Sequence, residues 1–482
     1  MIIVKKMTIL IFLIASLFIS AKAAEGDYII KFKGDAPVMF MYDDSEDLGA
    51  GLRLVPASQA NYLNKAGLLE ICEPDCEMTL YDTPNDTQYA DQWNLPIIKA
   101  EAAWSFKTFG NDVLVGIVDS GLCENHPDID YSRVVEGYNF AASKDDQDYA
   151  TEIYNTTDTV GHGTKVSGTI IASMNNSEGL AGIADKVKLI PLKCADKTGA
   201  IWKSAVINAI NAGAGYFGCD VINISIGDGI QSDALDYYIN YAQNLGCIVV
   251  AAVGNNTTAD PGNHLRYPAA CSGVIGVGST TIANTRATSS VVNESVDVCA
   301  PAASIPLLSH LGGYTTGGGT SFAAPQVAAA AAIAKSIDPY ITPAEFAELL
   351  QKTVTKPTAN KDITYRDNDF GYGILNIENM VNELLKNRTV YVSPFDESTS
   401  SVTIFNLTGN PISATSIFAL YSYVNDNMSA YDPENITIPA NDHVERFFGI
   451  NKYGRLKHFL WTSLYSAMPF DNYQYFREMQ KN

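Results

Sequence analysis

Three reactive side chains stand beside glycines in separate segments of this chain. Asp119 ends an apolar run, His162 lies between two glycines, and Ser321 follows three glycines. A carboxylate, an imidazole and a hydroxyl are groups from which acid–base and nucleophilic catalysis are built. We therefore ask first whether the rest of the sequence can bring these side chains together.

Each of these segments also has a simpler explanation when it is taken alone. A strand-end aspartate commonly caps a turn, a histidine between glycines can be a loop residue, and Thr320 and Ser321 can cap the following helix. Flanking glycines nevertheless let backbone or substrate approach His162 closely. We expect Pro325 in the first turn of a helix, which would place Ser321 near a helix N-terminus whose dipole favours negative charge.

Short apolar runs alternate with helical patterns through the middle of the chain. Continuous Val/Ile/Leu runs of this kind are typical of a parallel sheet covered by helices on both faces. The expected strands are 113–118, 188–192, 221–226, 247–253 and 274–277, and the expected helices include 327–334 and 343–351. The sequence therefore predicts an α/β fold, in which side chains at the carboxyl ends of strands can meet at one edge of the sheet.

In the chain order Asp, His, Ser, these segments resemble the subtilisin-like serine peptidases, or subtilases. The resemblance covers about residues 84–385. It rests on the motifs Asp119-Ser-Gly121, His126-Pro-Asp128, Gly161-His-Gly-Thr164, Val221-Ile-Asn-Ile-Ser225, Ala252-Val-Gly-Asn255 and Gly319-Thr-Ser-Phe-Ala-Ala-Pro325. Lys165 and Gly318 depart from the common family pattern, at positions without a catalytic role.

The resemblance implies a serine endopeptidase that hydrolyses peptide bonds through an acyl-enzyme intermediate. Ser321 would be the nucleophile, His162 its base and Asp119 the group that orients the imidazole. Asn255 would donate to the oxyanion together with the backbone N–H of Ser321, although a turn asparagine beside Gly254 is the simpler alternative.

The resemblance also implies where a peptide substrate binds. A substrate strand would pair with the backbone of Ser225, Ile226 and Gly227. The pocket for the residue before the scissile bond would be lined by Ala251, Ala252, Val253 and Gly254, with broad specificity and an apolar or aromatic preference. Asp228 could favour a basic or small side chain there, or could be a solvated turn carboxylate.

A structural calcium ion is a further implication of the resemblance. Its ligands would be Asp86, Asp128 and Asn176 together with backbone oxygens of Met174, Glu178 and Leu180, a hard oxygen set that suits Ca²⁺. The alternative is a polar turn ahead of the strand that begins near residue 188.

The remaining features concern localisation and partners. Two lysines, an apolar run over 7–20 and Ala21-Lys-Ala23 predict that residues 1–23 are a signal peptide and that the protein is secreted, with an uncleaved anchor as the alternative. The net charge of −21 argues against a nucleic-acid partner. None of the cysteines stands in a paired metal-ligand pattern. We expect a monomer that acts on peptides or proteins.

Flanking segments divide the chain further. Residues 24–82 are predicted to be a small α+β propeptide that inhibits the enzyme, or alternatively an N-terminal strand and linker that remain in the mature protein. The catalytic domain would span 83–386, followed by an all-β, sandwich-like accessory domain over 387–482.

Two rival functions remain at this stage. An esterase or lipase of the α/β-hydrolase type would need Gly-x-Ser-x-Gly around Ser321 and the order Ser, acid, His, and the chain has neither. An inactive scaffold that binds through its β-rich tail would not need the intact set of motifs.

Overall fold

The computed structural model describes only part of the chain. The described residues are 27–33, 46–49, 52–74, 83–104, 113–143, 148–258, 260–357, 366–386, 390–392, 401–406, 412–421, 428–438, 443–447, 455–461 and 477–478. Contacts divide the chain into two units, Met1–Leu80 and Tyr81–Asn482. Each unit is described by itself. The predicted signal peptide, residues 1–23, lies outside the described residues.

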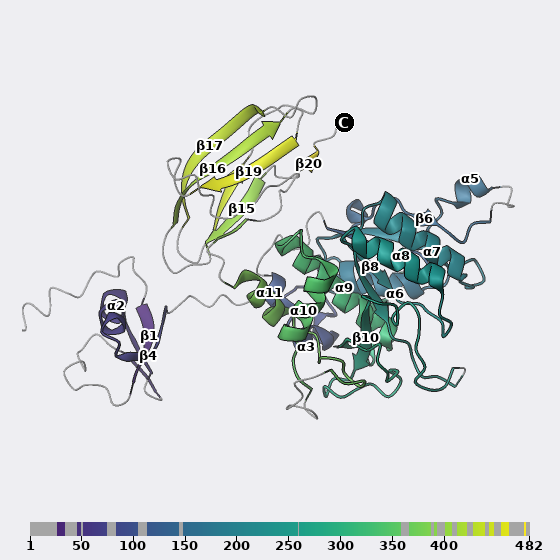
Figure 1. Ribbon diagram of the computed structural model, residues 1–482, viewed down its shortest axis with the longest axis horizontal. Coiled ribbons are helices and arrows are strands. Elements are labelled where there is room, and N and C mark those ends of the chain that lie inside the picture. Colours follow the sequence, from purple (N-terminus) through teal and green to yellow (C-terminus); the bar gives the residue numbers. More distant parts are fainter. Residues whose placement is uncertain are drawn as a thin grey trace, which may run out of the picture. The chain divides into compact units, whose positions relative to one another are not determined.

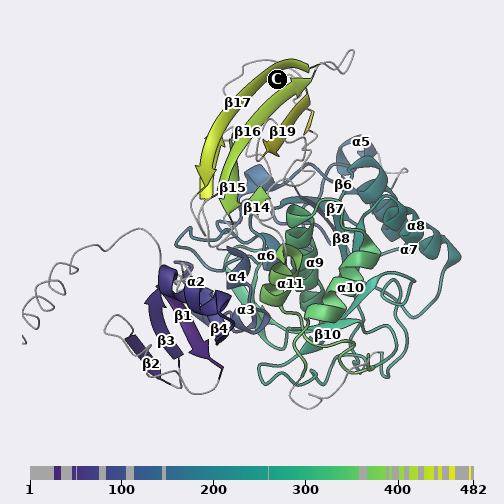
Figure 2. The same ribbon diagram turned by 60° about the vertical axis from the view of Figure 1, so that its left-hand side comes forward.

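The first unit is a small antiparallel sheet with one helix, coloured purple in Figure 2. Its strands lie in the order β2-β3-β1-β4, and β1 pairs with both β3 and β4. The buried side chains of Ile30, Val55 and Leu63 join the sheet to the helix. The elements are β1(Asp27–Phe32), β2(Glu46–Gly49), β3(Leu52–Pro56), α2(Ala57–Lys65) and β4(Leu69–Pro74).

The second unit contains a seven-stranded sheet in the order β11-β10-β9-β8-β5-β7-β6. All neighbouring strands of this sheet pair in parallel, as the sequence predicted. All five expected strands are present, and two short ones, β6 and β11, were not expected. The strands are β5(Leu114–Asp119), β6(Tyr138–Asn139), β7(Lys188–Lys193), β8(Val221–Ile224), β9(Ile248–Ala252), β10(Ile275–Thr280) and β11(Val298–Pro301).

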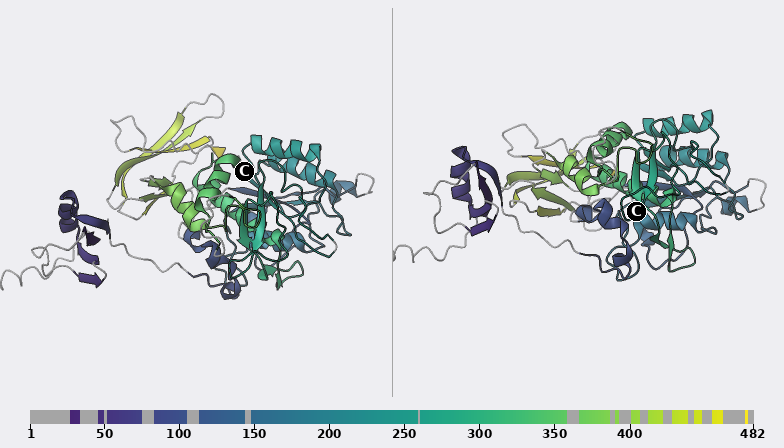
Figure 3. Two further views of the ribbon diagram at one scale, coloured as in Figure 1. Left: turned by 60° about the horizontal axis from the view of Figure 1, so that its bottom comes forward. Right: turned by 90° about the horizontal axis from the view of Figure 1, so that it is seen from below.

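Helices cover both faces of this sheet because its strands are apolar on both sides. Along β9, Ile248 and Val250 belong to one buried cluster, whereas Val249 and Ala251 belong to the other. Helices α7(Lys203–Asn211) and α8(Asp233–Asn244) pack into the second cluster and lie side by side in Figures 1 and 3. The fold is therefore the predicted α/β arrangement with helices on both faces.

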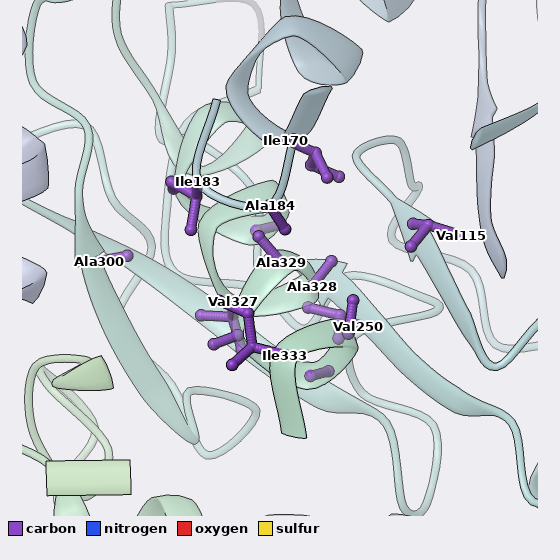
Figure 4. Close-up of a cluster of buried hydrophobic side chains, with 14 of the residues drawn as sticks. Val115, Ile170, Ile183, Ala184, Val250, Ala300, Val327, Ala328, Ala329 and Ile333 are labelled. Atoms are coloured by element: carbon purple, nitrogen blue, oxygen red, sulfur yellow. The ribbon is translucent and has the colours of Figure 1, made fainter. Parts of the chain in front are cut away.

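The first cluster is built around a long buried helix, α9, which runs from Thr320 to Ile337. Its alanines let it pack closely against the sheet, and Figure 4 shows Ala328 and Ala329 among larger aliphatic side chains. The other helices that contribute to this cluster are α3(Asn94–Ile98), α4(Glu101–Trp104), α6(His162–Ile171), α10(Pro343–Thr353) and α11(Ile377–Leu385).

Short elements complete the body of this unit. They are the helix α5(Tyr149–Glu152), the 3-10 turns η2(Tyr89–Asp91) and η3(Tyr131–Arg133), the π turn η4(Ala212–Tyr216), and the hairpin of β12(Ile305–Leu308) with β13(Tyr314–Gly317).

The C-terminal strands, yellow-green in Figure 1, form two antiparallel sheets. One has the order β14-β15-β18 and the other β17-β16-β19-β20. This agrees with the predicted all-β character, and it gives pairings that the sequence left open. The strands are β14(Val390–Val392), β15(Ser401–Asn406), β16(Ile412–Tyr421), β17(Met428–Ile438), β18(His443–Phe447), β19(Arg455–Trp461) and β20(Arg477–Glu478).

Two further properties of the described residues concern their helices and their cysteines. Among these residues, no helix is long and apolar enough to cross a membrane. Six cysteines are free and buried, which agrees with their predicted character as small apolar side chains. They are Cys123, Cys194, Cys219, Cys247, Cys271 and Cys299.

Candidate active site

Asp119 and His162 meet where a strand ends and a helix begins. Asp119 is the last residue of β5 and is buried, while His162 is the first residue of α6 and its side chain is 32% exposed. The imidazole Nδ1 lies 2.8 Å from Asp119 Oδ1 and 3.0 Å from Oδ2. Burial disfavours the charged imidazole, but the charge and hydrogen bond of Asp119 outweigh burial and raise the pKa of His162.

A second buried carboxylate, Asp158, fixes the start of α6. Its Oδ1 accepts hydrogen bonds from Ser120 Oγ and from the N–H groups of Val160 and Gly161, and its Oδ2 accepts from the N–H and hydroxyl of Thr164. Burial favours the neutral acid, but these hydrogen bonds lower the pKa of Asp158 below its ordinary value. A negative charge therefore holds the helix that carries His162.

The glycines around His162 have a steric explanation. Gly161 has a φ of 89°, in the left-handed region that glycine adopts without strain. A Cβ on Gly163 would lie 2.2 Å from the carbonyl oxygen of Gly121, so a larger residue would push α6 away from the end of β5. Both glycines thus allow His162 to approach Asp119.

Ser321 is the second residue of α9 and is bonded twice to Ser225, which follows β8. The Ser321 hydroxyl donates to the Ser225 carbonyl oxygen at 3.2 Å, and the Ser225 hydroxyl donates to the Ser321 carbonyl oxygen at 2.9 Å. The prediction that Pro325 lies in the first turn of the helix was wrong, because Pro325 lies inside α9. The second of these bonds explains how the helix tolerates it. Pro325 has no N–H for the Ser321 carbonyl, and the Ser225 hydroxyl takes the place of that donor.

The simple capping explanation for Thr320 and Ser321 is wrong. The N-cap of α9 is Gly319, with a φ of 133° and no side-chain capping bond. The Thr320 hydroxyl instead accepts from the N–H of Gly254, and the Thr320 N–H donates to Asn255 Oδ1 at 3.1 Å. Within the described part of the chain, Asn255 Nδ2 donates no hydrogen bond, so this amide group remains available to a ligand.

His162 contacts the residue that follows Ser321 in the chain, and no described hydrogen bond joins the two side chains. The ring of Phe322, the residue after Ser321, lies 5.6 Å from the imidazole ring of His162. No hydrogen bond between the described atoms joins Ser321 to His162, because the serine hydroxyl donates to Ser225. In enzymes without a bound substrate this serine–histidine hydrogen bond is often missing, and it forms when the substrate binds.

A cavity of about 450 Å³ lies beside Ser321 and Asn255. Five of the seven predicted substrate-binding residues line it: Ser225, Ile226, Gly227, Ala252 and Gly254. The other two, Ala251 and Val253, do not line it but belong to the buried cluster beneath the sheet. Successive side chains of a strand point to opposite faces, which explains why Ala252 lines the cavity while its two neighbours do not.

Sequence reasoning missed most of the charged residues that line this cavity. Asp228 does line it, and its Oδ1 lies 3.2 Å from Lys203 Nζ, so it is an ion-paired carboxylate. Asp260 and Arg266 are also in the lining, from the segment between β9 and β10. Neither belongs to one of the motifs quoted above, and the only sequence signal was their position shortly after Asn255.

Comparison with known proteins identifies the family. The family model described as "Subtilase family" (Peptidase_S8) matches residues 110–373, more than half of the chain. This chain belongs to the subtilase family. It is 35% identical over 286 residues to subtilisin DY of Bacillus licheniformis, which covers 59% of this chain and 97% of that protein.

Two further proteases are similar to this chain. Thermitase of Thermoactinomyces vulgaris is 35% identical over 255 residues, 53% of this chain and 86% of that protein. A solved protease structure from Pseudoalteromonas arctica PAMC 21717 is 27% identical, with a TM-score of 0.54, and the match covers 63% of this chain and 100% of that one. The subtilase is a serine endopeptidase, and the predicted enzyme class and fold are confirmed.

The predicted metal ligands of this subtilase gather in part. Both oxygens of buried Asp128 accept hydrogen bonds, one from Asn176 Nδ2 at 2.9 Å and one from the Leu180 N–H at 2.8 Å. Asp86 Oδ2 accepts from the N–H of Asn175, and Asn176 Oδ1 accepts from the N–H of Glu178.

This cluster concentrates negative charge in a buried place. Burial raises the pKa of Asp128 to about 6, with a further rise from the charges of Asp86 and Glu178, and burial also raises the pKa of Asp86. Burial and the charge of Asp128 raise the pKa of the nearby Tyr314 hydroxyl to about 12. The described residues contain no group of three or more His, Cys, Asp or Glu that could hold a metal. None of the described hydrogen bonds joins Met174 to the cluster.

Proposed function

We propose that this subtilase is a secreted endopeptidase in which Ser321 is the nucleophile, His162 the general base and Asp119 the residue that orients the imidazole. The observation that carries the proposal is the Asp119–His162 bond beside a serine at the start of a buried helix. A carboxylate accepts the Nδ1 proton, which leaves Nε2 free to take a proton from a hydroxyl.

In the first chemical step, Ser321 Oγ attacks the carbonyl carbon of the scissile bond while His162 Nε2 takes the hydroxyl proton. The serine hydroxyl must first leave its bond to the Ser225 carbonyl. The tetrahedral intermediate then collapses: the C–N bond breaks, and His162 gives its proton to the leaving amine. The product of this step is an ester between Ser321 and the acyl half of the substrate.

Water completes the reaction by the same groups in the same roles. His162 takes a proton from water as the water oxygen attacks the acyl carbon, and then returns the proton to Ser321 Oγ as the ester bond breaks. Asn255 Nδ2 and the N–H of Ser321 stabilise the negative oxygen in both steps. The Asn255 side chain supports this role because its Oδ1 is held by Thr320, which fixes the direction of the amide.

For substrate binding, we propose that a peptide strand pairs with the backbone of Ser225–Gly227 and that its side chain before the scissile bond enters the cavity beside Ser321. Ile226, Ala252 and Pro268 give this cavity apolar walls, which support the apolar or aromatic preference predicted from the sequence. Four charged side chains in the same lining oppose it. The apolar or aromatic preference therefore stays a prediction.

The chain divisions predicted from the sequence complete the proposal. Residues 1–23 would direct export, 24–82 would be an inhibitory propeptide removed by the enzyme itself, 83–386 would be the catalytic domain, and 387–482 an accessory domain. The compact α+β core of Met1–Leu80 supports a propeptide that folds as a unit. The antiparallel sheets after residue 389 support a separate accessory domain.

Processing can be followed by N-terminal sequencing of the secreted protein. The wild type should begin near residue 82, whereas Ser321→Ala should keep residues 24–82 when no other protease is present. A serine-less variant that is still cut near Tyr81 would contradict self-processing.

A structural calcium ion fits the chemistry of the Asp128 cluster, because two buried carboxylates and the side-chain oxygen of Asn176 offer hard oxygen ligands. Asp86, Asp128, Asn176 and the backbone oxygens of Glu178 and Leu180 would hold it. The ion would stabilise the fold by offsetting the repulsion between the two carboxylates. Chelation should lower the melting temperature of the wild type more than that of Asp128→Asn, and equal shifts would argue against this site.

The nucleophile is tested by Ser321→Ala. This change removes the hydroxyl without deleting core volume, so we expect an unchanged circular-dichroism spectrum and no hydrolysis of a small peptide substrate. Turnover retained by a purified Ser321→Ala protein would overturn the assignment.

A further inference from the structure

The cavity beside Ser321 contains a buried cation that the reaction itself does not use. Arg266 is 5% exposed, and it lines the same cavity as Ser321 and Asn255. We propose that Arg266 makes this enzyme prefer an acidic side chain, glutamate above all, at the residue before the scissile bond. This inference rests on the proposed function, because it assumes that the substrate side chain enters this cavity.

The stem of Arg266 packs against the wall of the cavity nearest the reacting groups. A Cβ on Gly254 would lie 2.8 Å from Arg266 Cγ and 3.3 Å from its Nε. Gly254 directly precedes Asn255, the proposed oxyanion donor. A substrate side chain that enters the cavity and is long enough to pass Gly254 therefore approaches the guanidinium of Arg266.

The hydrogen bonds of the guanidinium are incomplete. Nη1 donates to the carbonyl oxygen of His264 at 3.2 Å. Nη2 lies 2.7 Å from Asp260 Oδ2, which is close enough for an ion pair, yet Nη2 is buried and makes no hydrogen bond of acceptable geometry to any of the described residues. A buried N–H without a well-placed acceptor is costly, and a guanidinium satisfies such donors best with a carboxylate.

Asp260 is poorly placed to remain the ion-pair partner of Arg266 when a substrate is present. Its side chain is 58% exposed, whereas that of Arg266 is 6% exposed. Backbone bonds with Thr257 hold the turn around Asp260, and the ion pair is the one interaction described for its carboxylate. A substrate carboxylate inside the cavity can therefore replace Asp260, whose side chain can turn into water.

The other cation that lines the cavity, Lys203, has both an ion pair and a hydrogen bond. Lys203 Nζ lies 3.2 Å from Asp228 Oδ1 and donates to the carbonyl oxygen of Ile230 at 2.7 Å. Leu235 and Pro268 add apolar lining that suits the two methylene groups of glutamate. An aromatic side chain would cover the guanidinium without supplying an acceptor, and a basic one would be repelled by it.

The test compares tetrapeptide p-nitroanilides that are identical except for the last residue, which is Glu, Gln, Asp, Leu or Phe. Glutamine has the shape of glutamate without the charge, so the Glu:Gln ratio of kcat/KM isolates the ion pair. A charge-assisted hydrogen bond in a buried site predicts a ratio of roughly ten to one hundred for the wild type. A ratio near one, or a best substrate with Leu or Phe, would contradict the inference.

Two variants assign the preference to these residues. Arg266→Ala should bring the Glu:Gln ratio close to one, and Arg266→Lys should retain part of it. Asp260→Asn alters an exposed side chain that competes with the substrate, so it should leave the fold intact and raise the ratio. If Asp260→Asn lowers the ratio, Arg266 does not bind the substrate carboxylate.

Fluorophosphonate labelling of Ser321 separates this inference from the proposed function. If the wild type is labelled but its Glu:Gln ratio of kcat/KM is near one, the nucleophile is active and the inference about Arg266 is contradicted. If Arg266→Ala is labelled and its ratio is near one, the inference is supported, because the variant has lost the preference and kept the nucleophile. No labelling and no hydrolysis of any substrate by the mature wild type would contradict the proposed function, and the inference with it.

Discussion

Helices α6 and α9 both begin after a glycine with positive φ, but different groups fix their N-termini. At α6, the buried carboxylate of Asp158 accepts hydrogen bonds from two side chains and from three backbone N–H groups. At α9, neutral groups make the connections: the hydroxyls of Ser225 and Thr320 and the amide of Asn255. Neither helix has a side-chain N-cap.

The difference follows the charges that each helix must accommodate. His162 becomes positive during the proposed reaction, so the negative groups Asp119 and Asp158 suit its end of the site. Ser321 lies where a negative oxygen develops, and a carboxylate there would oppose that charge. The N–H groups of Thr320 and Phe322 donate to Asn255 and Gly319, and among the described residues the N–H of Ser321 has no acceptor, so it is free to act on the oxyanion.

Removing the charge beside His162 should have the largest effect. Asp119→Asn should lower kcat/KM by about 10⁴-fold, because the amide can no longer hold the imidazole in the required tautomer. The pKa of His162 is raised by Asp119, so the acidic limb of the kcat/KM–pH profile should also move to lower pH. A pH–rate series on one peptide substrate measures both effects. An acidic limb that does not move would show that Asp119 does not set this pKa.

Asn255 is one of the neutral groups at the start of α9. Asn255→Ala should lower kcat by roughly 10²- to 10³-fold with little change in KM, because the lost hydrogen bond forms mainly in the transition state. Asn208→Ala, an exposed asparagine change on α7, is the matched control. An unchanged kcat for Asn255→Ala would move the oxyanion role to another group.

Asp158→Asn tests whether the charged anchor positions His162. The amide cannot accept all five hydrogen bonds, so we expect a loss of roughly 2 kcal/mol in unfolding free energy and about a tenfold loss in kcat/KM. The lowered pKa of Asp158 means that its contribution to stability is present above the unfolded pKa and is lost as the pH falls through the folded one. The variant should therefore lose less stability than the wild type on acidification.

Urea unfolding at several pH values measures this difference. Asp148→Asn, an exposed aspartate change without a side-chain capping bond, is the control for the loss of one charge. If Asp158→Asn loses stability on acidification as steeply as the wild type, the folded chain does not depend on that charge.

Ser225→Ala should have the smallest effect. It removes the hydrogen bond to the Ser321 carbonyl and the one that the Ser225 hydroxyl accepts from Asn223 Nδ2. Both bonds are neutral, so we expect a loss of about 1 to 2 kcal/mol in stability and a fall of less than tenfold in kcat. Ser225→Thr keeps the hydroxyl and should recover most of the loss in a thermal melt. A fall in kcat/KM as large as that of Asp158→Asn would mean that neutral and charged anchors do not differ as described.

The sequence predicted the central fold well because its signals were local. Continuous apolar runs mark five strands of the parallel sheet, and Asp119, His162 and Ser321 stand beside motifs that can be seen in the sequence. Strand β6 escaped because it has only two residues, and β11 because its sequence, Val-Cys-Ala-Pro, is not a continuous Val/Ile/Leu run.

The errors came from interactions between distant residues. The start of α9 was misplaced because Pro325 follows Ser321 by only four positions, and its tolerance depends on the hydroxyl of Ser225, nearly one hundred residues earlier. Arg266 was missed because no local pattern shows that a loop after β9 turns back into the cavity. The pairing of the C-terminal strands likewise depends on contacts that alternation within one strand does not specify.

A fluorophosphonate adduct located by peptide mass spectrometry tests most directly the central claim that Ser321 is a nucleophile activated by His162. The mature wild type should carry one adduct, on the peptide that contains Ser321, and His162→Ala should label far more slowly while Asp148→Asn labels at the wild-type rate. An adduct on another residue, or equal labelling of the wild type and His162→Ala, would contradict the claim.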